Sequence, residues 1–336
     1  MMGKKLRLAF AGCGDISRHI ALGARLNLRI SPVACMDADG TRAAAFSRKH
    51  RIPAHYDDYG RMLSEINPDA VYIAVPHHLH RSMILAAVRS GVHVLCEKPI
   101  TTCMTDAVEV CLRAREAGVK VGINYQYRYD PACYPMVRAA QSGALGEIYY
   151  ARCNLPWHRE GSYFSDGPWR GMITTAGGGT LITQASHILD IALAAMGSRP
   201  ARARGYTARR VFTGVEVEDL CMGIVELENG ASISITSSMI ASPEQPVTIE
   251  LYGSRGTAVY TGPDRPRVRF MGVKPRREKS PVWGLHALFR SLEGFRRWVS
   301  GGTPYLCPAD ESLPVLAAVL AVYRSAKSGL KEPVEI

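Results

Sequence analysis

Residues 6–17 read LRLAFAGCGDIS, and this stretch decides the fold. The apolar run from Leu6 to Gly12 predicts a buried strand, and the glycine turn after it opens a predicted helix from Asp15 to Leu26. Glycines in such a turn let the backbone approach a pyrophosphate, which binds at the positive amino end of the helix. The third fingerprint glycine is replaced by Ser17, which is small enough for close helix packing; a plain strand-to-helix turn is the alternative. The predicted cofactor contacts in this turn are Gly12, Gly14, Asp15 and Ile16.

A second predicted strand, Ile30 to Met36, ends at Asp37. An acidic side chain about 20 residues beyond the glycine turn accepts hydrogen bonds from the adenosine ribose, and its charge repels a 2′-phosphate. The sequence therefore favours NAD over NADP. Arg42 and Arg48 lie downstream and could bind a 2′-phosphate, so NADP remains an alternative cofactor. For Asp37, the alternative is an ordinary turn or capping role.

Helices and strands alternate through the first 124 residues. The further predicted helices are Tyr59 to Ile66, Arg81 to Ser90 and Thr105 to Ala117, and the further strands are Ala70 to Val75, His93 to Cys96 and Lys120 to Asn124. This alternation predicts a doubly wound parallel sheet, which binds ligands at the carboxyl ends of its strands. Pro76 and His80 follow one such end and are predicted to contact the cofactor, although histidines in loops are often solvated.

Glu97, Lys98 and Pro99 come directly after the strand that ends at Cys96. The proline fixes the direction of the lysine, and an ammonium at this edge can hydrogen-bond a substrate hydroxyl, lower its pKa and pass on a proton. Lys98 is therefore a candidate catalytic residue, and Glu97 is a candidate cofactor contact. A surface lysine paired with Glu97 is the alternative.

Three segments occur in a recognisable order: GCGDIS at 12–17, CEKP at 96–99, and GGGTLITQASHILD from Gly177. Together with the closing stretch that contains YRSAKSG, they resemble the family named after glucose-fructose oxidoreductase, inositol dehydrogenase and a rhizopine-catabolism protein (Gfo/Idh/MocA). The resemblance implies a Rossmann domain followed by an α+β domain, and NAD(P)-dependent oxidation of a sugar-like hydroxyl. It also implies that Lys98 and His187 are the catalytic residues.

The glycine run at 177–179 allows close backbone approach, and residues 180–196 predict an apolar helix. Thr183 and Gln184 share a face of this helix with His187, so both are candidate substrate contacts. The family usually has an aspartate where Thr183 stands, which leaves His187 and Lys98 to act on the substrate hydroxyl. Asp190, one turn further on, is expected to orient the imidazole or to contact solvent or backbone.

The second half of the chain predicts a different domain, residues 125–336, after a first domain of residues 1–124. Its predicted strands are 148–153, 220–226, 232–237 and 247–252, and they suit a mostly antiparallel sheet whose free face serves a homodimer or homotetramer. The candidate substrate contacts Tyr163, Trp169 and Arg170 lie in a loop before the glycine run, where a packed loop is the alternative. Residues 265–283 are basic and irregular in pattern, and they are interpreted as a flexible excursion.

Composition excludes several classes of protein. The chain has 336 residues and a formal net charge of +11, but its cations are dispersed apart from short clusters such as 274–279. This pattern favours a mildly anionic ligand over nucleic acid, with solvated charged faces as the alternative. The nine cysteines show no ligand spacing, which predicts reduced thiols and no metal. No run approaches the roughly 20 apolar residues of a membrane span, and the start lacks a leader pattern, so a cytoplasmic location is expected.

The leading hypothesis is hydride transfer between a carbohydrate hydroxyl and nicotinamide, on a sugar, uronate or nucleotide sugar and with the pyranose C3 as one candidate position. Proximity supplies much of the rate of such a reaction. Two alternatives remain open at this point. One is NAD-dependent glycoside cleavage by transient oxidation and elimination, and the other is a regulator that binds nucleotide without turnover.

Overall fold

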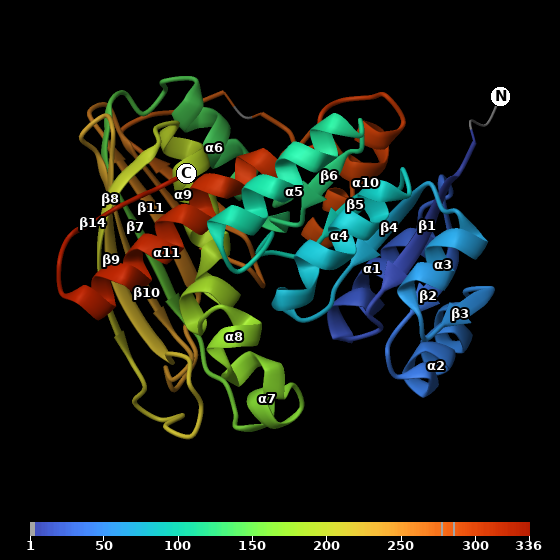
Figure 1. Cartoon of the computed structure of the whole chain (residues 1–336). Helices are drawn as coiled ribbons and strands as arrows, with labels where there is room; N and C mark the ends of the chain where they lie inside the picture. The colour runs from blue at the N-terminus through green and yellow to red at the C-terminus, as the bar shows by residue number, and fades with distance from the viewer. Residues whose placement is uncertain (1–3, 277, 285) are drawn as a thin grey trace. The chain divides into compact units, whose positions relative to one another are not determined.

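The computed structural model describes residues 4–276, 278–284 and 286–336, and it divides into two compact units (Figure 1). Unit 1 runs to residue 101 and adds residues 105–126 and 281–311, whereas unit 2 comprises residues 102–104, 127–280 and 312–336. The amino-terminal residues 1–3 and residue 277 of the basic cluster lie outside the described residues. No described helix is long and apolar enough to cross a lipid bilayer.

Unit 1 is built on a six-stranded parallel sheet in the order β3-β2-β1-β4-β5-β6. Its strands are β1 (Leu6–Ala11), β2 (Ile30–Met36), β3 (Ala54–Tyr56), β4 (Ala70–Ile73), β5 (His93–Cys96) and β6 (Val121–Ile123). The strand order reverses between β1 and β4, and ligands of such sheets bind beyond the carboxyl ends of the strands at this point. The predicted doubly wound parallel sheet is confirmed.

The helices of this unit connect the parallel strands. They are α1 (Asp15–Leu26), α2 (Gly40–His50), α3 (Tyr59–Ile66), α4 (His80–Arg89) and α5 (Met104–Glu116). Neither α2 nor β3 was predicted from the sequence. The capping signal for α2 was nevertheless present, because the Asp39 carboxylate accepts hydrogen bonds from the amides of Thr41 and Arg42.

Residues 281–311 pack with unit 1, although the boundary predicted after residue 124 placed them in the second domain. Helix α10 (Ala287–Val299) lies against α1, where a Cβ on Gly23 would come within 2.6 Å of the Phe289 ring. The Ile123 amide donates to the Cys307 carbonyl at 3.0 Å, so the returning chain covers the edge of β6. The first unit is therefore discontinuous in sequence.

Unit 2 contains an eight-stranded sheet in the order β13-β12-β11-β7-β10-β9-β8-β14. Its strands are β7 (Ile148–Pro156), β8 (Pro200–Ala208), β9 (Leu220–Leu227), β10 (Ser232–Ser238), β11 (Val247–Gly253), β12 (Thr257–Gly262), β13 (Arg267–Met271) and β14 (Glu332–Pro333). Only β10 and β7 pair in parallel, so the mostly antiparallel sheet is confirmed. Strand β13 corrects the interpretation of residues 265–283 as irregular, because Val268 and Phe270 alternate with exposed residues and pair with β12.

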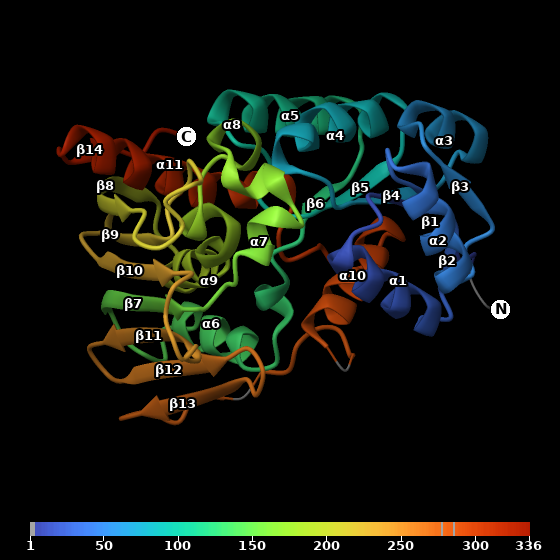
Figure 2. The same cartoon turned by 90° about the horizontal axis from the view of Figure 1, so that it is seen from below.

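Helices cover one face of this sheet (Figures 1 and 2). The helices of unit 2 are α6 (Cys133–Gln141), α7 (Ser162–Ser165), α8 (Ile173–Ala176), α9 (Ser186–Met196) and α11 (Leu313–Ser328). The helix predicted over residues 180–196 is divided, because a π-helical turn, η4 (Leu181–Ala185), precedes α9. Nearly every residue of α9 is buried, so this helix forms the centre of the core of unit 2.

Candidate active site

The glycine turn of unit 1 has the geometry of a phosphate cradle. Gly12 has a φ of +90°, and a Cβ there would lie 2.1 Å from the Ala74 carbonyl oxygen, so both conformation and space require glycine. The buried Ser17 hydroxyl, in place of the third glycine, donates to the Gly12 carbonyl at 2.6 Å. Gly14 brings no side-chain cap to α1 within the described chain, which leaves the first helical amides to bind an anion.

Asp37 lies beside this turn, at the end of β2. One carboxylate oxygen accepts from the Cys13 amide at 2.9 Å, and the other accepts from the Asp39 amide at 3.1 Å. The Arg42 guanidinium lies 3.7 Å from the same carboxylate, which is only 12% exposed. Asp37 therefore fixes the glycine turn and is placed where an adenosine ribose binds in this fold.

Glu97 follows β5 and is held by hydrogen bonds from two sides. Its Oε1 accepts from the Tyr72 hydroxyl at 2.5 Å and from the Asn124 side-chain amide at 2.6 Å. Burial raises the pKa of Glu97, and the two donors and the neighbouring Lys98 charge oppose that rise. Lys98 is half-buried directly beside this fixed carboxylate.

The returning segment 281–311 extends this network. The Ser291 hydroxyl donates to Asn124 Oδ1 at 2.6 Å and also lies 2.6 Å from the Tyr305 hydroxyl. Since the single proton of Ser291 is used on Asn124, Tyr305 must donate to Ser291. The donors thus run in one direction from Tyr305 to Glu97. Glu97 stands in a sequence motif, whereas no motif marks the approach of Ser291 or Tyr305 to Asn124.

His80 has an internal role, which corrects the prediction that it contacts the cofactor. Its ring is completely buried, with Nδ1 2.7 Å from the Pro99 carbonyl oxygen and Nε2 3.0 Å from the Val75 carbonyl oxygen. Burial lowers the pKa of His80 to about 4, so at pH 7 the neutral ring donates only one of these bonds. Pro76 follows Val75 and Lys98 precedes Pro99, so the His80 ring links the two loops that carry Pro76 and Lys98.

His187 lies in α9, which η4 precedes, and residues distant in sequence cap the amino end of η4. The Glu218 carboxylate accepts from the amides of Gly179 at 2.6 Å and Leu181 at 3.0 Å, and its carbonyl accepts from Thr180 at 3.1 Å. The next amide, that of Ile182, donates to the Tyr323 hydroxyl at 3.2 Å. Two side chains therefore satisfy amides that every helix leaves without partners.

This cap also explains the glycine run. Gly178 has a φ of +151°, and a Cβ there would lie 2.4 Å from the Tyr323 hydroxyl. A Cβ on Gly179 would lie 1.9 Å from the Glu218 carbonyl oxygen. Burial raises the pKa of Glu218, whereas the Leu181 amide and the Tyr323 hydroxyl, which donates at 2.8 Å, lower it. Glu218 was not predicted from the sequence, and Tyr323 stood out only within the YRSAKSG match.

The His187 ring is buried and stacks on Tyr127, with ring centroids 5.1 Å apart and 22° between the planes. Thr183 and Gln184 are also buried, and the Thr183 hydroxyl donates to the Gly179 carbonyl at 2.6 Å. Asp190 is completely buried, which rules out the predicted contact with solvent. Its carboxylate binds Arg128 through Nε at 2.9 Å and Nη2 at 2.7 Å.

The three predicted substrate contacts in the loop before the glycine run lie together. The Arg170 guanidinium is 5.0 Å from the centroid of the Tyr163 ring and 5.1 Å from that of Trp169. These separations are within the range of cation–π interactions. The structure therefore forms one cationic and aromatic cluster from residues that are up to seven positions apart.

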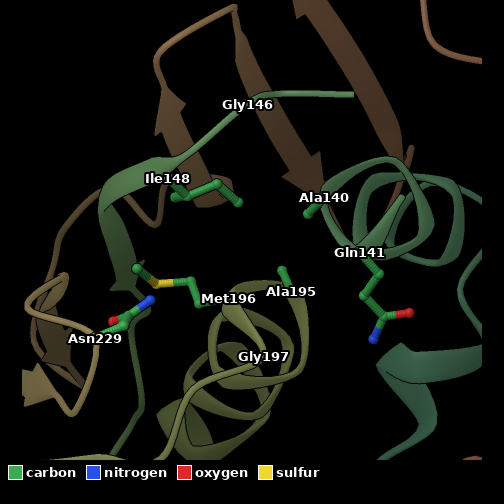
Figure 3. Close-up of a pocket in the computed structure, with 8 residues that line it drawn as sticks. All are labelled: Ala140, Gln141, Gly146, Ile148, Ala195, Met196, Gly197 and Asn229. Atoms are coloured by element: carbon green, nitrogen blue, oxygen red, sulfur yellow. The ribbon is translucent and has the colours of Figure 1, made fainter. Parts of the chain in front are cut away.

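Two cavities lie away from these groups. The first, with a volume of about 320 Å³ and shown in Figure 3, is bordered by the carboxyl end of α9 at Met196 and by Asn229, and it has no charged lining residue. The second, of about 840 Å³, is a basic hollow at the amino ends of β1 and β5, the edge opposite to the one that binds cofactors. Neither supplies the groups that hydride transfer requires.

Comparisons with known proteins identify the class. Residues 6–125 match the oxidoreductase family with an NAD-binding Rossmann fold, and residues 136–259 match the GFO/IDH/MocA C-terminal domain. Inositol 2-dehydrogenase 2 of Saccharopolyspora erythraea is 30% identical over 81% of this chain and 78% of that protein. D-glucoside 3-dehydrogenase of Escherichia coli K12 is 26% identical over 98% of both chains.

A solved structure is similar throughout. The WlbA dehydrogenase of Bordetella pertussis, in complex with NADH and UDP-GlcNAcA, aligns with a TM-score of 0.86 and 27% identity over 99% of this chain and all of that one. The chain belongs to the GFO/IDH/MocA oxidoreductase family, as its sequence motifs indicated. It is an NAD-binding oxidoreductase.

Proposed function

We propose that the protein moves a hydride between a carbinol carbon of a sugar-like substrate and nicotinamide, with Lys98 and His187 acting on the reacting hydroxyl. The observation that carries the proposal is that hydrogen bonds fix the segments that carry Lys98 and His187, at the positions where the family's fold has these residues. Lys98 follows the fixed carboxylate of Glu97, and His187 follows a helix start that Glu218 caps. The two relatives named above, which act on an inositol and a D-glucoside, support a polyhydroxylated substrate.

The residues of unit 1 fit a bound NAD. The amides of Gly14, Asp15 and Ile16 suit its pyrophosphate, Asp37 suits its adenosine ribose, and Pro76 and Glu97 border the same edge of the sheet. When bound, NAD supplies the acceptor for the hydride.

Side chains of the protein handle the proton and the charge of the reacting hydroxyl. Oxidation releases a proton from the hydroxyl and a hydride from its carbon, so the site needs a base and a group that stabilises the developing alkoxide. We assign the base to His187 and the stabilising role to the Lys98 ammonium. Thr183 and Gln184 are proposed substrate contacts on the His187 helix. A pyranose C3 hydroxyl is the favoured position because of the D-glucoside 3-dehydrogenase relative.

We further propose that copies of the chain associate through the uncovered face of the unit 2 sheet. Tyr150, Tyr206, Met222 and Ile224 project from this face and are 42–49% exposed. The strand register places Tyr206 beside Met222, which brings apolar side chains together. A homodimer or homotetramer in the cytoplasm remains our prediction.

The decisive experiment is a screen for NADH formation across free sugars, uronates, sugar phosphates and nucleotide sugars. Lys98→Met and His187→Ala should each lower turnover by on the order of 10²-fold or more, the scale of a positioned proton-transfer group. NADH affinity, measured by fluorescence, should change little. Near-normal turnover in either folded variant would overturn the assignment, and release of an aglycone without NADH accumulation would indicate elimination instead.

A further inference from the structure

Two arginines of unit 2, in a short stretch of chain, each lie close to two aromatic rings. The Arg159 guanidinium is 4.8 Å from the Trp157 ring centroid and 5.9 Å from that of Tyr163. The Arg170 guanidinium is 5.0 Å from the Tyr163 ring centroid and 5.1 Å from that of Trp169. The series therefore alternates aromatic and cationic side chains, and Tyr163 belongs to both halves.

The two arginines differ in how their charge is balanced. Arg159 lies 3.4 Å from a carboxylate oxygen of Glu244 and donates to the His158 carbonyl at 2.7 Å. Arg170 makes only a long contact of 3.5 Å with the Tyr163 carbonyl, and no aspartate or glutamate of the described residues forms an ion pair with it. A half-buried guanidinium without a counter-charge is a strong site for an added anion.

The geometry of Arg170 defines which kind of anion it can bind. The Tyr163 and Trp169 rings lie close to the guanidinium, and its Nη1 lies against Gly167 and the Tyr163 carbonyl, so the remaining N–H donors of the guanidinium fork are the part available to a ligand. That fork matches the paired oxygens of a carboxylate or phosphate group.

The local backbone holds Arg170 in place. Arg170 belongs to a 3-10 turn, η3 (Pro168–Gly171), and a Cβ on the preceding Gly167 would lie 1.8 Å from the Arg170 Nη1. The Thr175 hydroxyl donates to the Trp169 carbonyl at 2.6 Å, and the Glu216 amide donates to the Gly171 carbonyl at 2.8 Å. The guanidinium therefore occupies space that only a glycine at position 167 leaves open.

We propose that Arg170 binds an anionic group of the substrate, so that the preferred substrate is an acidic sugar bearing a carboxylate or a phosphate. This inference rests on the proposed function for the reacting hydroxyl, and it adds the substrate class. Arg170 is a specificity-determining residue that acts at a distance from the carbon that is oxidised.

The test compares sugars that share the glucose ring and differ in the group at C6. Initial rates of NADH formation are measured with glucose, which is neutral, and with glucuronate and glucose 6-phosphate, which are anionic. The wild type should show a kcat/KM at least tenfold higher for an anionic member than for its neutral partner. Arg170→Met should lower kcat/KM on that anionic sugar by roughly 10- to 100-fold, with a much smaller loss on the neutral one.

Three variants make the test specific. Arg159→Met removes a cation from the same aromatic series, but one already paired with Glu244, and it should leave the discrimination unchanged. Arg170→Lys keeps the charge but not the fork of N–H donors. Its ratio of kcat/KM on the anionic sugar to that on the neutral sugar should lie between the ratios of the wild type and Arg170→Met. Gly167→Ala keeps both charge and fork but displaces the guanidinium, so it should also weaken discrimination while the protein stays folded.

Binding measured without turnover separates this proposal from the proposed function. Calorimetry with the NADH-loaded protein uses glucuronate, glucose 6-phosphate and glucose as probes. Binding of an anionic probe that is lost in Arg170→Met, without oxidation of any sugar, would support the anion site and reject the proposed reaction. Equal affinity for neutral and anionic probes, or equal losses on both in Arg170→Met, would overturn the proposal. Tighter binding of glucuronate would identify the anionic group as a carboxylate, and tighter binding of glucose 6-phosphate would identify it as a phosphate.

Discussion

At the scale of single residues, Asp37 binds the glycine turn through the Cys13 amide, and we propose that it also determines the choice of cofactor. We expect the wild type to prefer NAD to NADP by at least tenfold in kcat/KM, because each 1.4 kcal/mol of repulsion is a factor of about ten. Asp37→Ser should narrow this ratio. Asp39→Ser is the matched control, since serine retains the cap of α2 while a neighbouring charge is removed. A wild type that prefers NADP would refute the assignment.

The buried ring of His80 predicts a pH dependence of stability. Its pKa is about 4 in the folded chain, against an ordinary value of 6.5, so between these pH values the unfolded chain binds more protons. Stability should therefore fall as the pH drops from 6.5 to 4, by up to roughly 3 kcal/mol from this residue. His80→Asn should show a shallower fall in urea unfolding over the same range. Parallel curves for the two proteins would contradict the prediction.

Residues also show what the sequence could and could not predict about the site. Lys98, Glu97 and His187 could be proposed from the sequence because each stands in a motif that retains its residue type and order. Glu218 and Ser291 were missed because their partners, Gly179 and Asn124, are 39 and 167 positions away. The role of His80 was predicted wrongly because a loop histidine gives no sign that backbone carbonyls will enclose it.

At the scale of elements, the cap formed by Glu218 and Tyr323 is the clearest support for the His187 helix. Glu218→Gln replaces an acceptor with an amide group that faces backbone N–H donors, and it removes a negative charge from a helix start. We expect turnover to fall by about tenfold, with NADH affinity little changed. Glu216→Gln is the control, because Glu216 accepts the Ile173 amide nearby. Equal turnover in the two variants would argue against a positioning role.

Elements with a clear period and clear ends were predictable. The predicted bounds of α1 and α3 are those of the structure, because apolar residues recur on one face of each. Helix α2 was missed because a run of alanines gives it a weak period. The π-helical turn η4 was not predictable from local sequence, since the amides of Leu181 and Ile182 there are bonded to distant side chains.

At the scale of the whole molecule, the uncovered sheet face of unit 2 predicts self-association. Ile224→Lys would place a charge among the exposed apolar residues and should shift the protein toward a smaller species in light scattering after gel filtration. Val211→Lys, at a residue 60% exposed in a loop, should leave the assembly unchanged. A wild-type protein that is monomeric in this measurement would contradict the prediction that the chain associates through this surface.

The discontinuity of unit 1 has a consequence for how the protein is made. A ribosome delivers residues in order, so Gly12, Asp37 and all six parallel strands emerge long before α10 and Cys307. Until residues 281–311 follow, the surface of α1 around Gly23 and the edge of β6 have no cover. The nascent first unit therefore stays incomplete until strands β7 to β13 of the second sheet have been synthesised.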